Sequence, residues 1–253
     1  MTMEIVRTAY GDLIPCSDAS DLRKKYRYPV EYYSNGNLKS IYLQEPTVVS
    51  TPSGDLQAEL MTFYEDGSIK RLFPLYGQLS GYWSIEDELE NAPYYGFNIQ
   101  GEIYTIRPQC IYFYPSGKIR SITLWSGDEL EVITSTGTVR TKLGVELYET
   151  GKIRSIEPVF GTVLKTPYGE IRPFVYKIHM LHAEDSSLKF SEEGELIEFG
   201  TLHTTVDTGG TEYRSEGYLS PLIVSLGKGD LTIKRSHEKD IRIDTSIYEV
   251  RFR

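Results

Sequence analysis

One phrase occurs five times along the 253 residues of the chain, and it constrains the fold more than any other feature. Each copy has an apolar or aromatic run, a glycine, and a second apolar run. The copies are VEYYSNGNLKSI, MTFYEDGSIKRL, IYFYPSGKIRSI, VELYETGKIRSI and LKFSEEGELIEF, aligned on Gly36, Gly67, Gly117, Gly151 and Gly194. Two strand-forming runs around a glycine are typical of a β-hairpin, so the phrase predicts an array of hairpins.

Pro115 selects the turn of the third copy. In a two-residue loop it would occupy the last paired strand position, where it has no N–H to give to the ladder. In a three-residue loop, a type I turn followed by a left-handed glycine, its fixed φ suits the first central position. We therefore predict a three-residue loop closed by the glycine in all five copies.

This register places one face of every hairpin in the core. The residues four before and two after each glycine should be opposed, and all of them are apolar or aromatic. The pairs are Tyr32 with Leu38, Phe63 with Ile69, Phe113 with Ile119, Leu147 with Ile153 and Phe190 with Leu196. On the other face, the same register pairs Glu31 with Lys39 and Glu146 with Arg154 directly across the strands.

That other face carries two columns of side chains that are candidates for ligand binding. The candidates are Tyr33, Tyr64, Tyr114, Tyr148, Lys39, Lys70, Arg120 and Arg154. Aromatic rings beside cations can hold a sugar, a peptide or an anionic ligand. A meander repeats every exposed position, however, and tyrosine suits a half-buried strand, so a purely structural role is the other interpretation.

A second phrase alternates with the first, as in VRTAYGDL, VSTPSGDL, ITSTGTV and LKTPYGEI, with weaker copies around Gly101 and Gly229. Pro52 and Pro167 stand where Pro115 does, which predicts the same turn. Connectors as short as those at 125–129 and 141–144 allow only antiparallel neighbours. We expect an all-β protein: an antiparallel meander of repeated β-hairpins forming an elongated curled sheet, open barrel or two-layer array. A small β-propeller is the alternative, because paired hairpins make four-stranded blades.

We expect a hairpin-repeat domain over residues 1–200, with short helical insertions near 17–26 and 84–92. Residues 201–253 are expected to add a Gly-rich loop (204–217) and C-terminal capping strands to the same domain. The second helix is supported by Ser84, a good N-cap, with an acidic residue three positions later. Its acidic residues are expected to form a solvated helix face, or alternatively to dock a basic partner: Glu86, Asp87, Glu88 and Glu90.

Charge and cysteine content limit the location and the partners of the chain. Its net charge of −9 argues against nucleic acid or an anionic membrane as a partner. No apolar run approaches the length of a membrane span. Cys16 and Cys110 have no CxxC spacing, which favours a reducing compartment and predicts a cytoplasmic protein.

The sequence shows none of the common catalytic signatures, such as Gly-x-Ser-x-Gly, a P-loop or HExxH. In HMLHAED, the nearest approach to a metal site, His179 and His182 would point to opposite faces of a strand, away from a joint site with Glu184 and Asp185. We therefore expect no metal, no cofactor and no enzymatic activity. A hydrolase with an unrecognised carboxylate or histidine site is kept as an alternative.

The pattern Tyr-x-x-Gly-x-[Leu/Ile]-[Lys/Arg]-Ser, as in FYPSGKIRSI and its sibling FYEDGSIKRL, resembles the hairpin repeats of MORN proteins. It is closer to the MORN-like repeats of bacterial proteins described as antitoxin components. The resemblance covers residues 28–200, and the chain departs from it in lacking the trailing Gly-x-Gly of each MORN unit. It implies a hairpin array that works by binding. We therefore expect a non-enzymatic protein-interaction module with a protein partner; the alternative is a small-ligand or glycan-binding protein that uses the Tyr/Arg face.

Overall fold

The structure, a computed structural model, describes residues 5–17, 23, 28–77, 83–175, 182–217, 220–235 and 239–253. The chain divides into two compact units, Met1–Trp125 (unit 1) and Ser126–Arg253 (unit 2). The expected helix near 17–26 falls mainly outside the described residues.

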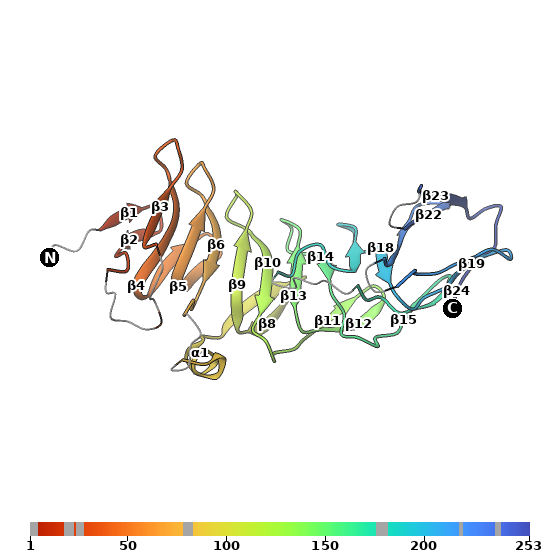
Figure 1. Ribbon diagram of the computed structural model, residues 1–253, viewed down its shortest axis with the longest axis horizontal. Helices are drawn as coiled ribbons and strands as arrows, with labels where there is room; N and C mark the ends of the chain where they lie inside the picture. The colour runs from red at the N-terminus through yellow and green to blue at the C-terminus, as the bar shows by residue number, and fades with distance from the viewer. Residues whose placement is uncertain are drawn as a thin grey trace. The chain divides into compact units, whose positions relative to one another are not determined.

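Unit 1 contains ten strands and one helix among its described residues (Figure 1). They are β1 (Val6–Thr8), β2 (Gly11–Leu13), β3 (Val30–Tyr32), β4 (Leu38–Thr51), β5 (Gly54–Phe63), β6 (Ile69–Phe73), α1 (Ile85–Asn91), β7 (Tyr95–Ile99), β8 (Glu102–Ile106), β9 (Pro108–Phe113) and β10 (Ile119–Leu124). The main sheet of the unit has the order β10-β9-β6-β5-β4-β3, while β1-β2 and β7-β8 form separate two-stranded sheets. The first-phrase turns lie at one end of the strands of the main sheet, and α1 lies near the other end of these strands (Figure 1).

Unit 2 contains the remaining strands of the described chain. They are β11 (Leu130–Thr134), β12 (Gly137–Thr141), β13 (Gly144–Leu147), β14 (Ile153–Ile156), β15 (Leu164–Thr166), β16 (Gly169–Ile171), β17 (Leu188–Phe190), β18 (Leu196–Thr201), β19 (Val206–Thr208), β20 (Glu212–Tyr213), β21 (Leu222–Leu226), β22 (Asp230–Lys234), β23 (Ile241–Asp244) and β24 (Val250–Phe252). The main sheet of the unit has the order β23-β22-β21-β18-β17-β14-β13, beside a two-stranded sheet β11-β12 and a sheet β15-β16-β24-β19-β20.

The predicted all-β antiparallel meander is confirmed. Within each unit, successive first-phrase hairpins hydrogen-bond to one another in one open sheet, as β6 does to β9 and β14 to β17. The units therefore lack the separate four-stranded blades of the propeller alternative among their described residues.

All five first-phrase turns have the predicted three-residue form. The glycine N–H donates to the carbonyl three residues earlier at 2.8–3.0 Å, and the N–H of that earlier residue donates to the carbonyl after the glycine at 2.8 Å. The five glycines have φ between 81° and 90°, the left-handed region that other residues enter at a cost. In the third copy, Pro115 is thus the first central residue of the loop, as predicted.

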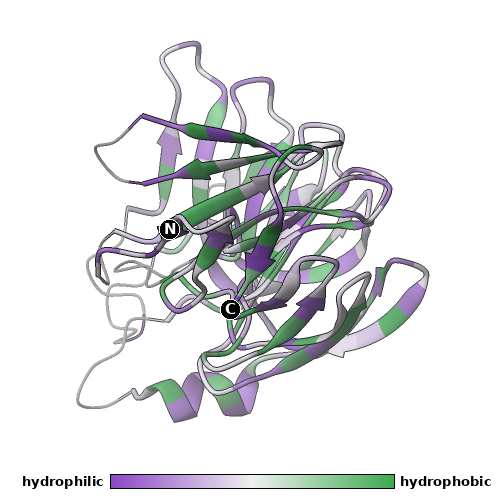
Figure 2. Ribbon diagram, turned by 90° about the vertical axis from the view of Figure 1, so that its right-hand side faces the viewer, coloured by the Kyte–Doolittle hydropathy of each residue, from purple (hydrophilic) through white to green (hydrophobic). Residues whose placement is uncertain are grey.

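The predicted register of the first phrase is also confirmed, since all five expected pairs are opposed. Their side chains build the core of each unit: Phe63, Ile69, Phe113, Leu147, Ile153 and Phe190 are at most 2% exposed. Burying one such side chain stabilises the fold by about 1.5–3 kcal/mol. Tyr32 differs, being 54% exposed, because β3 is the end strand of its sheet. Figure 2 shows the resulting alternation of hydrophobic and hydrophilic residues along the strands.

The charge pairs on the other face are shifted by one residue from the prediction. A β-bulge after the turn makes Glu31 pair with Ser40, and Glu146 with Ser155. The bulge places two residues of the second strand opposite one of the first, so Lys39 still lies 3.5 Å from Glu31. Arg154 likewise lies 3.9 Å from Glu146. The ion pairs are therefore diagonal rather than direct.

The prediction that the second phrase has the same turn is wrong. Its four main copies close on two-residue loops, in which a threonine pairs with the glycine three positions later. The threonine hydroxyl donates to the glycine carbonyl at 2.8–2.9 Å and accepts the N–H of the second loop residue at 3.1–3.2 Å. This arrangement is an ST-turn. Pro52 and Pro167 are compatible with it, because each occupies the first position of its loop.

One strand pairing is not antiparallel. β16 pairs in parallel with β24, where the Phe252 N–H donates to the Tyr168 carbonyl at 2.7 Å. The connectors in question are long, since β24 reaches β16 from far along the chain. The expectation that the connectors at 125–129 and 141–144 join antiparallel neighbours is wrong, because β11 and β12 form a sheet apart from β10 and from β13.

The expected second helix is present as α1, which begins after its N-cap Ser84. A capping box links Ser84 and Asp87 in both directions. The expectation that its acidic residues all face solvent is wrong for Glu88, which is 1% exposed and accepts hydrogen bonds from Arg23 and Trp83.

The end of the chain is more regular than expected. The segment 204–217 was expected to be a Gly-rich loop, yet it contains the hairpin β19–β20, which turns at Gly209 and Gly210. The boundary expected at residue 200, where the hairpin repeats end, lies inside β18. This strand pairs with β21 and so continues the main sheet. The later strands β22 and β23 add to that sheet, and β24 joins the smaller one.

Helix α1 is too short to cross a membrane, and no other described helix is long and apolar enough to do so. Neither Cys16 nor Cys110 forms a disulfide bond.

We predict that alanine at Gly117 destabilises unit 1 more than alanine at Gly67. Both glycines are left-handed, with φ of 81° and 85°, so each substitution should cost about 1–2 kcal/mol of backbone strain. Only at Gly117 would the new methyl group overlap Pro52, whose turn packs on this one and whose neighbour Ser53 donates to the Gly117 carbonyl at 3.0 Å. Urea unfolding should show an additional loss of about 1–3 kcal/mol for Gly117→Ala. Equal losses for the two variants would contradict the packing of the two turns.

Candidate functional site

The tyrosine column on the outer face joins successive hairpins. The hydroxyls of Tyr33, Tyr64 and Tyr148 donate to the carbonyls of Phe63, Phe113 and Phe190 at 2.8 Å each. Each acceptor lies four residues before the glycine of the next hairpin. These three tyrosines therefore have a structural role, whatever else their rings contact.

The bulges explain why cations gather on the outer face. In β6, Lys70 and Arg71 together oppose Thr62, so two side chains of this strand reach the face where a regular strand would send one. In β4, Lys39 and Ser40 occupy the same two positions opposite Glu31.

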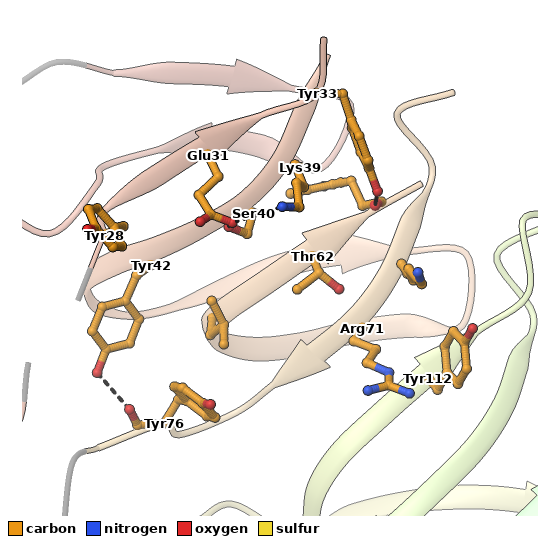
Figure 3. Close-up of a pocket in the computed structure, with 13 residues that line it drawn as sticks. Tyr28, Glu31, Tyr33, Lys39, Ser40, Tyr42, Thr62, Arg71, Tyr76 and Tyr112 are labelled. Atoms are coloured by element: carbon orange, nitrogen blue, oxygen red, sulfur yellow. Dashed lines mark hydrogen bonds and ion pairs between the residues drawn. The ribbon is translucent and has the colours of Figure 1, made fainter. Parts of the chain in front are cut away.

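A hollow of about 580 Å³ lies on this face of unit 1, over β3, β4, β5, β6 and β9. It is lined by Tyr28, Glu31, Tyr33, Lys39, Ser40, Tyr42, Leu60, Thr62, Phe63, Lys70, Arg71, Tyr76 and Tyr112. Figure 3 shows three tyrosines at one end and Arg71 with Tyr112 at the other. Three cationic side chains and one carboxylate line the hollow among the described residues, which favours an anionic ligand.

Two arginines stack on one tyrosine at the cationic end of the hollow. The Arg71 guanidinium lies 4.6 Å from the centre of the Tyr112 ring, and the Arg120 guanidinium lies 4.9 Å from it. Lys70 lies 5.4 Å from the ring of Tyr64. Lys70 makes no ion pair with any residue that the structure describes. Stacking on the rings holds these cations in place.

Polar groups lie between the two ends of the hollow. Glu31 accepts a hydrogen bond from Ser40 at 3.2 Å and pairs with Lys39 at 3.5 Å. Thr62 Oγ1 is buried and has no hydrogen-bond partner in the described part of the chain. Figure 3 places Thr62 between Lys39 and Arg71. A ligand atom over Thr62 would therefore lie between cations on two sides.

Tyr64, beside the cationic end, stays protonated well beyond the usual range of a tyrosine. Burial raises its pKa first, and the neighbouring Tyr112 hydroxyl raises the pKa further. Tyr64 therefore acts as a neutral hydrogen-bond donor over the whole physiological range of pH.

A buried ion cluster supports the other end of the hollow. Arg23 makes two 3.0 Å bonds to Glu59 and a 2.8 Å bond to Glu88, and both carboxylates are at most 1% exposed. Glu59 also accepts the N–H of Tyr76 at 2.6 Å, and the Tyr76 carbonyl accepts the hydroxyl of Tyr42 at 2.7 Å. The cluster thereby fixes the backbone of one tyrosine that lines the hollow.

On the equivalent face of unit 2, Arg154 and Lys189 both face carboxylates. Arg154 lies over the Tyr148 ring at 5.6 Å and pairs with Glu146. Lys189 lies between two carboxylates, at 2.6 Å from Asp185 and 2.9 Å from Glu198. Arg154 occupies the repeat position of Lys39 and Lys70, three residues after the glycine, whereas Lys189 occupies that of Thr62 and Tyr112.

The hollow contains three of the eight side chains proposed from the sequence, namely Tyr33, Lys39 and Lys70. Arg120 contacts the lining residue Tyr112, and its guanidinium lies 5.7 Å from the ring centre of Tyr114. Tyr148 and Arg154 belong to unit 2. Arg71 and Tyr112 also line the hollow and are not among the residues proposed from the sequence. The sequence does contain a signal for Arg71, which lies four residues after Gly67. A bulge after each three-residue turn brings the residue at this position to the outer face.

No group of histidine, cysteine and acidic residues able to hold a metal occurs in the described parts of the chain. His179 of the motif HMLHAED lies outside those parts. Comparison with protein-family models, with curated proteins and with solved structures found no match.

We predict that Tyr64→Phe lowers the free energy of unfolding by about 1 kcal/mol at neutral pH, because the bond to the Phe113 carbonyl is lost. Tyr33→Phe, which loses the equivalent bond to Phe63, should cost a similar amount.

A pH series tests the raised pKa of Tyr64. Its folded-state pKa lies above the ordinary value of 10.0, so the stability that it contributes is fully present below pH 10 and is lost as the pH rises further. Urea unfolding above pH 10 should therefore show a smaller loss of stability in Tyr64→Phe than in the wild type. Parallel curves for the two proteins would show that the tyrosine does not titrate as described.

Proposed function

We propose that this protein is a non-enzymatic interaction module that holds an acidic segment of a protein partner in the hollow of unit 1. The proposal is based on three cations, Lys39, Lys70 and Arg71, that line one hollow, with Arg71 over the ring of Tyr112. Clusters of cations on a rigid scaffold are a common means of recognising acidic motifs.

The negative net charge of the chain means that an acidic partner must be recognised at short range. The chain as a whole carries a net charge of −9, so long-range attraction does not favour an acidic partner. Binding must come from contacts inside the hollow, where desolvation strengthens each charged hydrogen bond. In unit 2, the ion pairs of Arg154 and Lys189 involve two cations and three carboxylates, whereas the hollow of unit 1 is lined by three cations and one carboxylate among the described residues.

The hollow gives little support to a hydrolase. A glycosidase-type mechanism needs two carboxyl groups across the scissile bond, and Glu31 is the one carboxylate among the described lining residues. The resemblance to MORN-like repeats and the cytoplasmic location remain predictions. Both are compatible with a module that works by binding.

A small anionic ligand or glycan is the second candidate. The volume of about 580 Å³ lies within the usual range for small-molecule sites, and tyrosine rings line both ends. A thermal-shift screen with anionic metabolites and acidic sugars examines it directly. A ligand that raises the melting temperature of the wild type and not that of Arg71→Ala would support this candidate.

The main proposal is tested by selecting peptides from a random library on the full chain. Enrichment of acidic sequences is expected, and a selected peptide should lose about tenfold in affinity, or about 1.4 kcal/mol, for Arg71→Ala and for Lys70→Gln. Isothermal titration measures the affinities. Arg154→Ala is the matched control, because this arginine occupies a repeat position in unit 2 and faces Glu146.

Three results would contradict the proposal: selected peptides without acidic enrichment, unchanged affinity in Arg71→Ala and Lys70→Gln, or an equal loss of affinity in Arg154→Ala. A circular dichroism spectrum and an unfolding curve for each variant separate lost binding from lost folding.

A further inference from the structure

Three junctions between successive first-phrase hairpins follow one pairing rule. The residue four after the glycine of one hairpin pairs with the residue five before the glycine of the next, and the following residue pairs with the one six before. The pairs are Ser40 with Thr62 and Ile41 with Met61, Arg71 with Tyr112 and Leu72 with Ile111, and Ser155 with Lys189 and Ile156 with Leu188. At each of these junctions a tyrosine hydroxyl of the first hairpin also donates to the next hairpin. The molecule thus shows three times which partner fits the first strand of such a hairpin.

The strand β3 lacks this partner. It is the end strand of the unit 1 sheet, and no described residue pairs with its free side. Val30 is half-buried and Tyr32 is 54% exposed, whereas their equivalents Met61 and Phe63 are 0% and 2% exposed. The first hairpin therefore exposes apolar positions that the later hairpins bury against a neighbour.

The backbone of β3 also has polar groups available on this side. The Pro29 carbonyl accepts the Tyr42 N–H and the Tyr33 N–H donates to the Asn37 carbonyl, both at 2.8 Å, so these residues face β4. Backbone groups alternate in direction along a strand, which turns those of Val30 and Tyr32 toward the free edge. The Tyr32 carbonyl is the repeat equivalent of the Phe63 carbonyl, which accepts a tyrosine hydroxyl.

We infer that the free edge of β3 binds a β-hairpin of a protein partner that repeats the Tyr-x-x-Gly phrase and adds its second strand to the unit 1 sheet. The tyrosine of the partner donates to the Tyr32 carbonyl, and an apolar residue of the partner pairs with Val30. The residue that pairs with Glu31 is basic, by charge complementarity across the strands.

A second copy of this chain is a poorer occupant of the edge. A two-fold pairing of β3 with the β3 of another copy, centred on the strand, would oppose Glu31 to itself. Binding at the edge of β3 does not involve the cations of the hollow. It can therefore be tested independently of the proposed acidic partner.

The probe is a cyclised, fluorescently labelled peptide with the sequence of residues 61–72, MTFYEDGSIKRL. Under the pairing rule, its arginine faces Glu31, its last leucine faces Val30 and its tyrosine reaches the Tyr32 carbonyl. Fluorescence anisotropy with the full chain should show saturable binding. A peptide with phenylalanine in place of the tyrosine should bind about fivefold more weakly, and one with glutamate in place of the arginine should bind still more weakly.

Two variants of the protein test the edge itself. Val30→Pro removes the outward N–H without removing a bond to β4, so the protein should fold normally and lose the peptide. Glu31→Lys should reverse the preference, so that the glutamate peptide binds better than the arginine peptide; a loss of folding cannot produce such a reversal. Arg71→Ala should leave peptide binding unchanged, which separates this site from the hollow.

Three results would overturn the inference. The first is the absence of saturable binding to the wild type, and the second is undiminished binding to a folded Val30→Pro protein. The third is self-association of the wild type that Val30→Pro abolishes, measured by sedimentation velocity, because a second copy would then occupy the edge.

Discussion

The three-residue turn closed by a left-handed glycine is the constraint on which the rest of this structure depends. It sets the register of each first-phrase hairpin, and register decides which residues enter the core. The bulge that follows the turn then sends two side chains of the second strand to the outer face. The same turn thus produces an apolar face that stabilises each unit and a polar face that carries the candidate site.

The outer face combines structural and binding roles. At three junctions a tyrosine hydroxyl links one hairpin to a carbonyl of the next, which accounts for Tyr33, Tyr64 and Tyr148 without a ligand. The cations differ between the units: Arg154 and Lys189 face carboxylates in unit 2, whereas Arg71 stacks on Tyr112 beside Lys70 in unit 1. A repeat architecture can therefore hold its backbone constant while single charges distinguish one hairpin from another.

The first phrase was predictable from the sequence because its register depends on local chemistry: Pro115 permits one turn, and apolar residues recur with a period of two. The turn of the second phrase was predicted wrongly, because the hydroxyl of a threonine such as Thr51 closes a two-residue loop, which is also compatible with a proline. Long-range features were out of reach, since no local pattern shows that β24 returns to β16 or that Glu88 turns inward to Arg23. The hollow was predicted only in part, because Arg71 reaches it through a bulge and Tyr112 through its neighbouring strand.

Solution NMR of the full chain shows whether the three-residue turn sets the register, because it measures contacts across the hairpins. With this register, nuclear Overhauser effects are expected between the side chains of Phe63 and Ile69, Phe113 and Ile119, Leu147 and Ile153, and Phe190 and Leu196. Couplings of left-handed φ are also expected at the glycines that close these turns. Contacts shifted by one residue, such as Phe63 with Ser68, would indicate a different turn and would contradict the two faces derived from it.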